Sequence, residues 1–352
     1  MRIAIISPPW VPVPPPAYGG TETVLDTLAR GLVAAGHSVL LYATGDSTCP
    51  VPLDFSFKSA LGVGTSGAAA ELRHAIDAYD RVADFDIVHD HTLVGPVYAD
   101  RLPWLPVVTT NHGPFESDLG PLYSAISDRV PVIAISHHQA SSARGVNLAG
   151  VIHHGVDLDR FAVGAGRGGY ALFLGRMSPD KGVHVAARAA RAAGVPLRIA
   201  AKMSEAAELD YFRRRVEPLL GGDVEFIGEV GYDEKIRLLG EAQCLLNPIA
   251  WPEPFGMVMI EALATGTPVV ATPSGAAPEI VTDGVTGYLA ADEAGLVTAL
   301  RRTAELDRSA CRASVVERFS AERMVQAHLR VYEQVAAANQ SRLLRGRLGR
   351  TA

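Results

Sequence analysis

Residues 2–43 have the sequence RIAIISPPWVPVPPPAYGGTETVLDTLARGLVAAGHSVLLYA, which contains one complete strand–turn–helix–strand unit. The short apolar run from Arg2 to Ser7 predicts a buried strand that ends at two prolines. The apolar periodicity of Thr23 to Ala35 predicts a helix, and Gly36 is a suitable C-cap. The next apolar run, Ser38 to Ala43, completes a βαβ unit. The sequence therefore predicts a parallel sheet that begins near residue 1.

The same alternation continues along the chain, and a length of 352 residues suits two domains. A glycine-rich stretch at 151–169 has little periodicity and predicts a linker. A second set of βα units begins with the apolar run Tyr170 to Leu174. We therefore expect an α/β protein of two Rossmann-like, doubly wound parallel-sheet domains that face a cleft. The expected limits are 1–165 and 166–320 for the domains, 321–340 for a last helix and 341–352 for a basic tail.

The composition is that of an ordinary globular protein, with 48% hydrophobic and 20% charged residues. A net charge of -6 gives no reason to expect a nucleic-acid partner. The three cysteines are far apart and form neither a disulfide framework nor a zinc pattern, and the N-terminus lacks the features of a signal peptide. We therefore expect a cytoplasmic protein with no integral membrane segment. The arginines of the tail favour a solvated segment, with weak attraction to an anionic membrane as the alternative.

Two carboxylates flank a predicted helix start in residues 253–263, EPFGMVMIEAL. Unpaired amides at the start of that helix, around Gly256 to Val258, are a suitable seat for phosphate oxygens. Glu253 and Glu261 could then accept hydrogen bonds from hydroxyls of a sugar ring and a ribose. The alternative is that Glu253 only responds to the helix dipole and that Glu261 faces solvent.

Basic and glycine residues follow other predicted strands. Arg176 and Lys181 lie on a glycine-rich loop, where a guanidinium and an ammonium suit a diphosphate leaving group. Alone, this loop would be a solvated basic turn. Gly19 and Gly20 precede a helix and allow a ligand to approach the backbone closely, although many βα turns contain two glycines. His112 comes just after a strand and points either into the predicted cleft or into a turn that it caps.

Together these features resemble the retaining glycosyltransferases of family 4, which have the GT-B fold, and the resemblance covers nearly the whole chain. Its most specific part is 253–289, EPFGMVMIEALATGTPVVATPSGAAPEIVTDGVTGYL, in which Glu253 and Glu261 have the family's E-x7-E spacing. The other matching segments are GGTE (19–22), TTNHG (109–113), HHGVDLDRF (153–161) and GRMSPDKG (175–182). Many relatives have Pro-Asn where this chain has His153 and His154, which we interpret as tolerated variation.

The resemblance implies roles for these residues. His112 and Glu253 would be catalytic: His112 would contact the donor sugar and help to stabilise positive character at its anomeric carbon, and Glu253 would hold its hydroxyls. Glu261 would bind the ribose, and Gly228 and Val230 would border the base. The last helix would pack on the N-terminal domain. The donor diphosphate would be bound by Gly20, Arg176, Lys181, Phe255, Gly256, Met257 and Val258.

In such enzymes the acceptor attacks from the face that the phosphate leaves, and the leaving phosphate serves as the base. No second carboxylate in this sequence is a convincing nucleophile for a double displacement. Neither a metal nor another cofactor is expected. Asp84-Phe85-Asp86 resembles a metal-binding D-x-D, and His89-Asp90-His91 resembles a metal cluster, but both are interpreted as structural.

The donor is expected to be a nucleoside diphosphate hexose, with UDP-glucose first and GDP-mannose second. The sequences around 7–22 and 251–262 are similar to a bacterial subgroup that includes UDP-glucose:tetrahydrobiopterin glucosyltransferases. The acceptor, a small molecule, lipid or glycan, would be selected by loops near 8–18, 46–67 and 113–123. A nucleotide-sugar epimerase, a phosphorylase-like enzyme and a non-catalytic nucleotide-sugar-binding module stay open as alternatives on the same fold.

Overall fold

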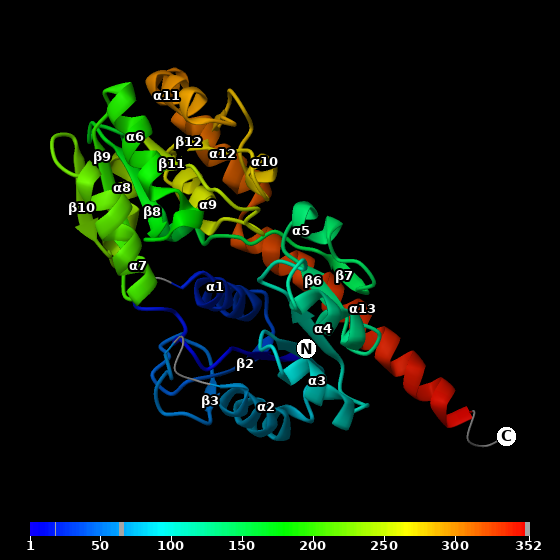
Figure 1. Ribbon diagram of the computed structural model, residues 1–352. Helices are drawn as coiled ribbons and strands as arrows, with labels where there is room; N and C mark the ends of the chain where they lie inside the picture. The colour runs from blue at the N-terminus through cyan, green and yellow to red at the C-terminus, as the bar shows by residue number, and fades with distance from the viewer. Residues whose placement is uncertain (18, 63–66, 349–352) are drawn as a thin grey trace. The chain divides into compact units, whose positions relative to one another are not determined.

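The computed structural model describes residues 1–17, 19–62 and 67–348, and the chain divides into two compact units (Figure 1). Unit 1 comprises 1–15, 19–155 and the chain from 321 onward, and unit 2 comprises 156–320 with residues 16 and 17. Tyr18 and 63–66, which belong to two predicted acceptor loops, and 349–352 of the predicted tail lie outside the described residues.

Unit 1 is built on a seven-stranded sheet whose strands all pair in parallel, in the order β3-β2-β1-β4-β5-β6-β7. The strands are β1 (Arg2–Ile6), β2 (Ser38–Ala43), β3 (Leu53–Phe55), β4 (Ile87–Asp90), β5 (Val107–Thr110), β6 (Val132–Ala134) and β7 (Leu148–Val151). Its helices are α1 (Gly20–Ala34), α2 (Ala68–Val82), α3 (Gly95–Tyr98), α4 (Leu119–Ile126), α5 (His137–Ser141) and α13 (Ala321–Leu348). The central strands β1, β4 and β5 are almost wholly buried, as expected for a parallel sheet covered on both faces, and β4 and β5 carry buried polar residues at their carboxyl ends.

The last helix, α13, packs against α1, β5 and β7 of unit 1 (Figure 1, red). A Cβ added to Gly31 of α1 would meet Val325 at 2.5 Å, so the glycine lets the two helices approach closely. Near its other end, Asn339 donates a 2.7 Å hydrogen bond to the carbonyl of Trp104. The helix continues to Leu348, which corrects the prediction that the last helix ends at residue 340 and is followed by a tail. That segment is rich in Leu and Arg, which are good helix formers.

Unit 2 is built on a six-stranded sheet, also parallel throughout, in the order β10-β9-β8-β11-β12-β13. The strands are β8 (Ala171–Arg176), β9 (Leu197–Lys202), β10 (Val224–Gly228), β11 (Cys244–Asn247), β12 (Val269–Ala271) and β13 (Gly287–Leu289). The helices are α6 (Val183–Ala193), α7 (Ala206–Tyr211), α8 (Tyr232–Glu241), α9 (Met257–Ala264), α10 (Ala277–Ile280), α11 (Glu293–Arg302) and α12 (Arg308–Arg318). Alanines on one face of α6 fill the core beside β8 and β9.

Unit 2 begins at residue 156, ten residues before the predicted limit of 165/166. The amide of Val156 donates a 2.9 Å hydrogen bond to the carbonyl of Phe319, at the end of unit 2. Arg312 on α12 donates hydrogen bonds to the carbonyls of Leu158 and Phe161. The glycine-rich segment is therefore tied to unit 2 by backbone and guanidinium hydrogen bonds that its own composition does not reveal.

Each sheet has one point at which the strand order reverses, and ligands of open α/β sheets collect at such points, beyond the carboxyl ends of the strands. In unit 1 the reversal lies between β1 and β4, and in unit 2 it lies between β8 and β11. Gly20 follows β1, Arg176 and Lys181 end or follow β8, and Glu253 follows β11. The predicted site residues therefore cluster at the edges where the topology favours ligands. Among the described helices, none is both long and apolar enough to cross a membrane.

Candidate functional site

The loop after β8 brings a lysine to the carboxylate of Glu253. Within unit 2, the Lys181 ammonium forms an ion pair with Glu253, and both side chains are largely buried, with exposed fractions of 10% and 16%. A Cβ on Gly182, whose φ is 74°, would meet the carbonyl of Pro248 at 2.0 Å. Only glycine allows this close contact between the loop after β8 and the loop after β11. Two segments that are 72 residues apart in the sequence thus form one site.

Arg176 ends β8, on the same loop as Lys181, and it is only half-buried. Its guanidinium lies 3.4 Å from the carboxylate of Asp180, four residues later, and both side chains are about one-third exposed. Such a pair is weak and readily exchanged for a stronger anion. Arg176 is therefore available to a diphosphate, although the structure pairs it with a residue of its own loop.

The loop that carries Glu253 is held from two sides. The amide of Ala276 and the hydroxyl of Ser274, both after β12, donate hydrogen bonds to the carbonyls of Glu253 and Trp251. The backbone of Glu253 is so close to Gly275 that a Cβ there would meet it at 2.2 Å. The loop after β12 therefore holds the backbone of Glu253, and with it the position of the carboxylate.

Several buried polar atoms around this loop have no hydrogen-bond partner among the described residues. They are Ser178 Oγ, Asn247 Nδ2, Trp251 Nε1 and Glu253 Oε2. Buried polar groups in folded proteins are almost always paired, so a group of unpaired ones calls for a ligand or water. This group combines two donors, a hydroxyl and a carboxylate oxygen, which is the set that a sugar ring with several hydroxyls would satisfy.

The start of α9 lies directly after Glu253. Gly256 caps the helix with a φ of 115°, a conformation that favours glycine. The first amides of the helix, including those of Met257 and Val258, have no intrahelical carbonyl to bind and carry the positive end of the helix dipole. The ring of Phe255 is buried against Phe319, so only the backbone of Phe255 can serve a ligand.

Glu261, on the second turn of α9, is not solvent-facing. Its side chain is 4% exposed, and its carboxylate lies 2.6 Å from the ammonium of Lys235 on α8. Gly228 ends β10 with a φ of 83°, and Val230 is half-buried in the turn between β10 and α8. Lys235 lies on the helix that follows the turn predicted to border the base, and it pairs with the carboxylate predicted to bind the ribose. Sequence reasoning missed Lys235, because nothing local links α8 to α9.

In unit 1, Gly20 begins α1, and a Cβ placed on it would meet nothing within 4 Å. Gly20 is exposed, so this helix start lies at the surface of unit 1. Glu22, in the first turn, is buried, and burial raises the pKa of its carboxyl to about 7. The glycine turn predicted from the sequence thus combines an exposed helix start with a buried carboxyl group whose pKa is raised.

His112, after β5, is half-buried and its ring contacts the buried histidines His91 and His154 of unit 1. Its Nε2 lies 2.9 Å from Nδ1 of His91, and its ring stacks on His154 with centroids 5.4 Å apart. Burial lowers the pKa of His112 to about 4 and that of His91 well below its ordinary value. His112 is therefore neutral at pH 7, and the side chain that fixes its ring is His91, which was predicted to be structural.

The two motifs interpreted as structural lie in different surroundings. His89 and His91 are core residues, and the two nitrogens of His89 bind Tyr332 and Thr110. Asp84 and Asp86 precede β4, at the amino edge of the sheet, and both bind Arg2. The D-x-D sequence of this chain is thus paired with an arginine at the edge opposite the predicted site.

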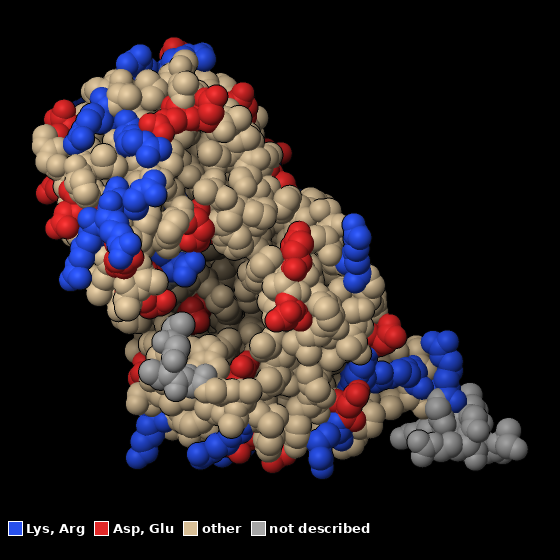
Figure 2. Space-filling view, in the orientation of Figure 1, with Lys and Arg blue, Asp and Glu red and all other residues tan. Residues whose placement is uncertain are grey.

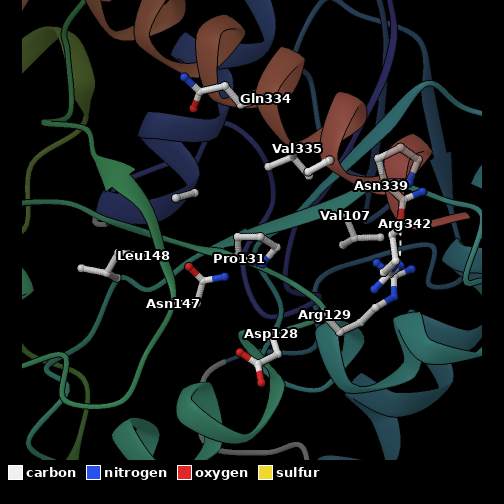
Figure 3. A pocket seen from close by; sticks show the side chains of 13 residues that line it. Val107, Asp128, Arg129, Pro131, Asn147, Leu148, Gln334, Val335, Asn339 and Arg342 are labelled. Carbon is white, nitrogen blue, oxygen red and sulfur yellow. Dashed lines mark hydrogen bonds between the residues drawn. The ribbon is translucent and has the colours of Figure 1, made fainter. Parts of the chain in front are cut away.

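A cavity of about 340 Å³ opens in unit 1 beneath α13 (Figure 3). Val335, Asn339 and Arg342 of the helix form one wall, and the starts of β5 and β7, at Val107 and Leu148, form the other. It therefore lies at the amino ends of the strands, and no residue predicted for the site lines it. On the face drawn in Figure 2, acidic and basic side chains are interspersed over the surface.

Two family models match the chain. Residues 18–160 match the model described as Glycosyltransferase Family 4, and residues 168–305 match the one described as Glycosyl transferases group 1. The phosphatidyl-myo-inositol mannosyltransferase of Mycolicibacterium smegmatis is 30% identical over 380 residues, which cover 96% of this chain and 95% of that protein. The glycogen synthase of Mycobacterium tuberculosis is 30% identical over 86% of this chain and 85% of its own.

Solved structures of glycosyltransferases have the same fold as this chain. AviGT4, a glycosyltransferase involved in avilamycin A biosynthesis, has a TM-score of 0.72 and 27% identity, with 96% of this chain and 98% of that chain covered. Anabaena HepE, in complex with UDP and glucose, has a TM-score of 0.76 at 20% identity, with 95% and 100% covered. The two parallel sheets match those of GT-B glycosyltransferases.

Proposed function

The chain belongs to glycosyltransferase family 4, and on that premise we propose that it moves a hexose from a nucleoside diphosphate sugar to a hydroxyl acceptor, with retention of configuration and without a metal ion. That it is a glycosyltransferase follows from the family; the donor, the stereochemistry and the independence of metal are the proposal. The observation that carries it is the buried Lys181–Glu253 pair beside the start of α9, with Glu253 Oε2 unpaired.

Lys181, Arg176 and the first amides of α9 would neutralise the charge that develops on the leaving diphosphate, where fixed cations and dipoles stabilise a transition state most. Gly20 would offer a further amide to that diphosphate. Glu253 would accept hydrogen bonds from hydroxyls of the transferred hexose through Oε2, while Lys181 holds its other oxygen. The pair thus links recognition of the phosphate to recognition of the sugar.

Glu261 would accept the ribose hydroxyls, with Lys235 compensating its charge, and Gly228 and Val230 would border the base. His112 would contact the transferred hexose. UDP-glucose is the first candidate donor, because the segments around 7–22 and 251–262 resemble a subgroup of UDP-glucose-dependent enzymes. A mannosyl donor, GDP-mannose, is the second, and the mannosyltransferases among the relatives support it. The acceptor is a small molecule, a lipid or a glycan.

A calorimetric titration with UDP, GDP, UDP-glucose and GDP-mannose tests the donor without the acceptor being identified. We expect either UDP and UDP-glucose or GDP and GDP-mannose to bind, and the nucleotide sugar to bind more tightly than the bare nucleotide. Acceptor screening with that donor, followed by the anomeric proton coupling of the product, tests retention. A product of inverted configuration, an epimerised sugar without transfer, or binding without any turnover would contradict the proposal.

A further inference from the structure

The hydrogen bond between His91 and His112 joins two ring nitrogens, Nδ1 of His91 and Nε2 of His112, 2.9 Å apart. Such a bond needs one N–H and one lone pair. Burial lowers the pKa of both rings, so each carries a single ring proton at neutral pH. The two tautomers are therefore coupled: the protons lie on Nδ1 of both rings or on Nε2 of both rings.

The surroundings of His91 distinguish these two states. Its Nε2 is buried and has no hydrogen-bond partner among the described residues. The ring of His89 lies against it, with centroids 3.9 Å apart, but both nitrogens of His89 are engaged, with Tyr332 and Thr110 at 2.7 Å. A proton on Nε2 of His91 would be a buried N–H without an acceptor, which is rare in folded proteins. A proton on Nδ1 is used in the bond to His112.

The backbone on either side of His112 is also held in place. The side-chain amide of Gln139, on α5, donates to the carbonyls of Asn111 and Gly113 at 2.9 and 2.7 Å. The amide of Gly113 donates to the Asn111 side chain at 2.9 Å. With its backbone clamped and one face stacked on His154, the ring of His112 has little freedom to turn. Its Nδ1 makes no hydrogen bond with any described residue, so this nitrogen is left for a ligand.

We propose that His91 is a positioning residue that donates its Nδ1–H to His112 and thereby holds the proton of His112 on Nδ1. His112 then offers the donor sugar a neutral N–H. The acceptor of this N–H would be a hydroxyl oxygen of the transferred hexose. To direct a lone pair of Nδ1 at a positively polarised anomeric carbon, His112 would need the opposite tautomer, with its proton on Nε2. The inference rests on the proposed function for the identity of the ligand, but the tautomer itself does not depend on it.

The tautomer can be measured directly in the whole protein. Imidazole ¹⁵N shifts distinguish a protonated nitrogen from a bare one, and the ring signals of His91 and His112 are assigned by their loss in His91→Asn and His112→Gln. We expect protonated Nδ1 and bare Nε2 in both rings of the native protein at pH 7.5. Protonated Nε2 in His112 would overturn the proposal.

A pair of nearly isosteric variants tests the consequence for binding. Asn in place of His91 can still donate an N–H near the position of Nδ1, whereas Asp offers only acceptor oxygens and forces the proton of His112 onto Nε2. The readout is the ratio of the affinity for UDP-glucose to that for UDP, or for GDP-mannose to GDP. We expect His91→Asn to keep the ratio and His91→Asp to lower it about tenfold, the size of one hydrogen bond.

His74→Gln is the matched control, because His74 is equally buried in unit 1 but binds the carbonyl of Ser7 through Nε2, which Gln can imitate. Its ratio should match that of the native protein. Equal ratios for the Asn and Asp variants, whether retained or lost, would overturn the role of His91. If neither nucleotide binds, the proposed function fails, while the ¹⁵N shifts of the native protein still decide the tautomer.

Discussion

The ammonium nitrogen of Lys235 lies 2.6 Å from a carboxylate oxygen of Glu261, and the two side chains are 17% and 4% exposed. A carboxylate so deeply buried needs a compensating charge, and Lys235 is the cation that the structure places beside it. The spacing of Glu253 and Glu261 identifies one partner of this pair and gives no indication of the other. Glu261 therefore has two roles to test: its charge pairs with Lys235 in the fold, and its carboxylate is proposed to bind the ribose.

Lys235→Met should therefore destabilise unit 2, because it leaves Glu261 buried and unpaired, at a cost of about 3 kcal/mol. The double variant Lys235→Met/Glu261→Gln should recover much of the lost thermal midpoint, since the buried charge is then absent. Arg237→Met is the control on the same helix: its partners Glu234 and Glu241 are exposed, and the midpoint should hardly change. A double variant no more stable than Lys235→Met would contradict this account.

Lys181→Ala should weaken binding of the nucleotide diphosphate about 10- to 100-fold, because one charge-assisted contact to the phosphate is lost. Titration calorimetry with UDP and GDP measures the effect. Lys202→Ala removes a lysine that pairs with Glu205 after the neighbouring strand β9 and should leave the affinity unchanged. An unaltered affinity in the Lys181 variant would remove this lysine from the site.

Glu253→Gln should lower turnover about 10- to 100-fold, because a carboxylate accepts hydrogen bonds from hydroxyls more strongly than an amide does. The affinity for the bare nucleotide should change far less, since the proposed contact is to the sugar. Comparing kcat with the Kd for UDP separates these effects. A single cooperative thermal transition confirms that the variant is folded, with a lower midpoint because Lys181 loses its buried partner. Turnover close to that of the native protein would exclude Glu253 from the chemistry.

Transfer should persist in excess EDTA, because Lys181, Arg176 and the first amides of α9 would neutralise the diphosphate without a metal ion. The assay compares initial rates after chelation with rates after Mg²⁺ or Mn²⁺ is added back. Activity that disappears on chelation and returns with the metal would contradict metal independence while leaving the fold assignment untouched.

Asp90 should make stability depend on pH between about 4 and 7. Complete burial raises the pKa of its carboxyl from 3.8 to about 7. Above pH 4 the unfolded chain releases this proton while the folded chain retains it, so the stability due to neutral Asp90 falls as the pH rises and levels off above 7. Asp90→Asn removes this effect.

The difference between the thermal midpoints of Asp90→Asn and the native protein should therefore increase from pH 4 to pH 7. The buried histidines, whose pKa values are lowered, act in the opposite direction, but they are common to both proteins and cancel in the difference. A difference that stays constant over this range would show that Asp90 does not titrate there.

The alternation of apolar strands with periodic helices was enough to predict two parallel-sheet domains, because each βα unit carries its own local signal. The strand predicted at Ser38 to Ala43 forms β2 with these bounds. The end of unit 1 was placed less well, because Val156 joins unit 2 through a hydrogen bond to Phe319, 163 residues later. Local composition carries no information about such a contact.

For the candidate site, the sequence by itself determined which residue types follow which strands: Arg176 and Lys181 at β8, Glu253 before α9, and His112 at β5. The tertiary structure alone decided what those side chains touch. It places Lys181 on Glu253, Lys235 on Glu261 and His91 on His112, each across two different loops or helices. The physical reason is that a motif records neighbours along the chain, whereas charge compensation and tautomers are set by neighbours across the sheet edge, where segments distant in sequence meet.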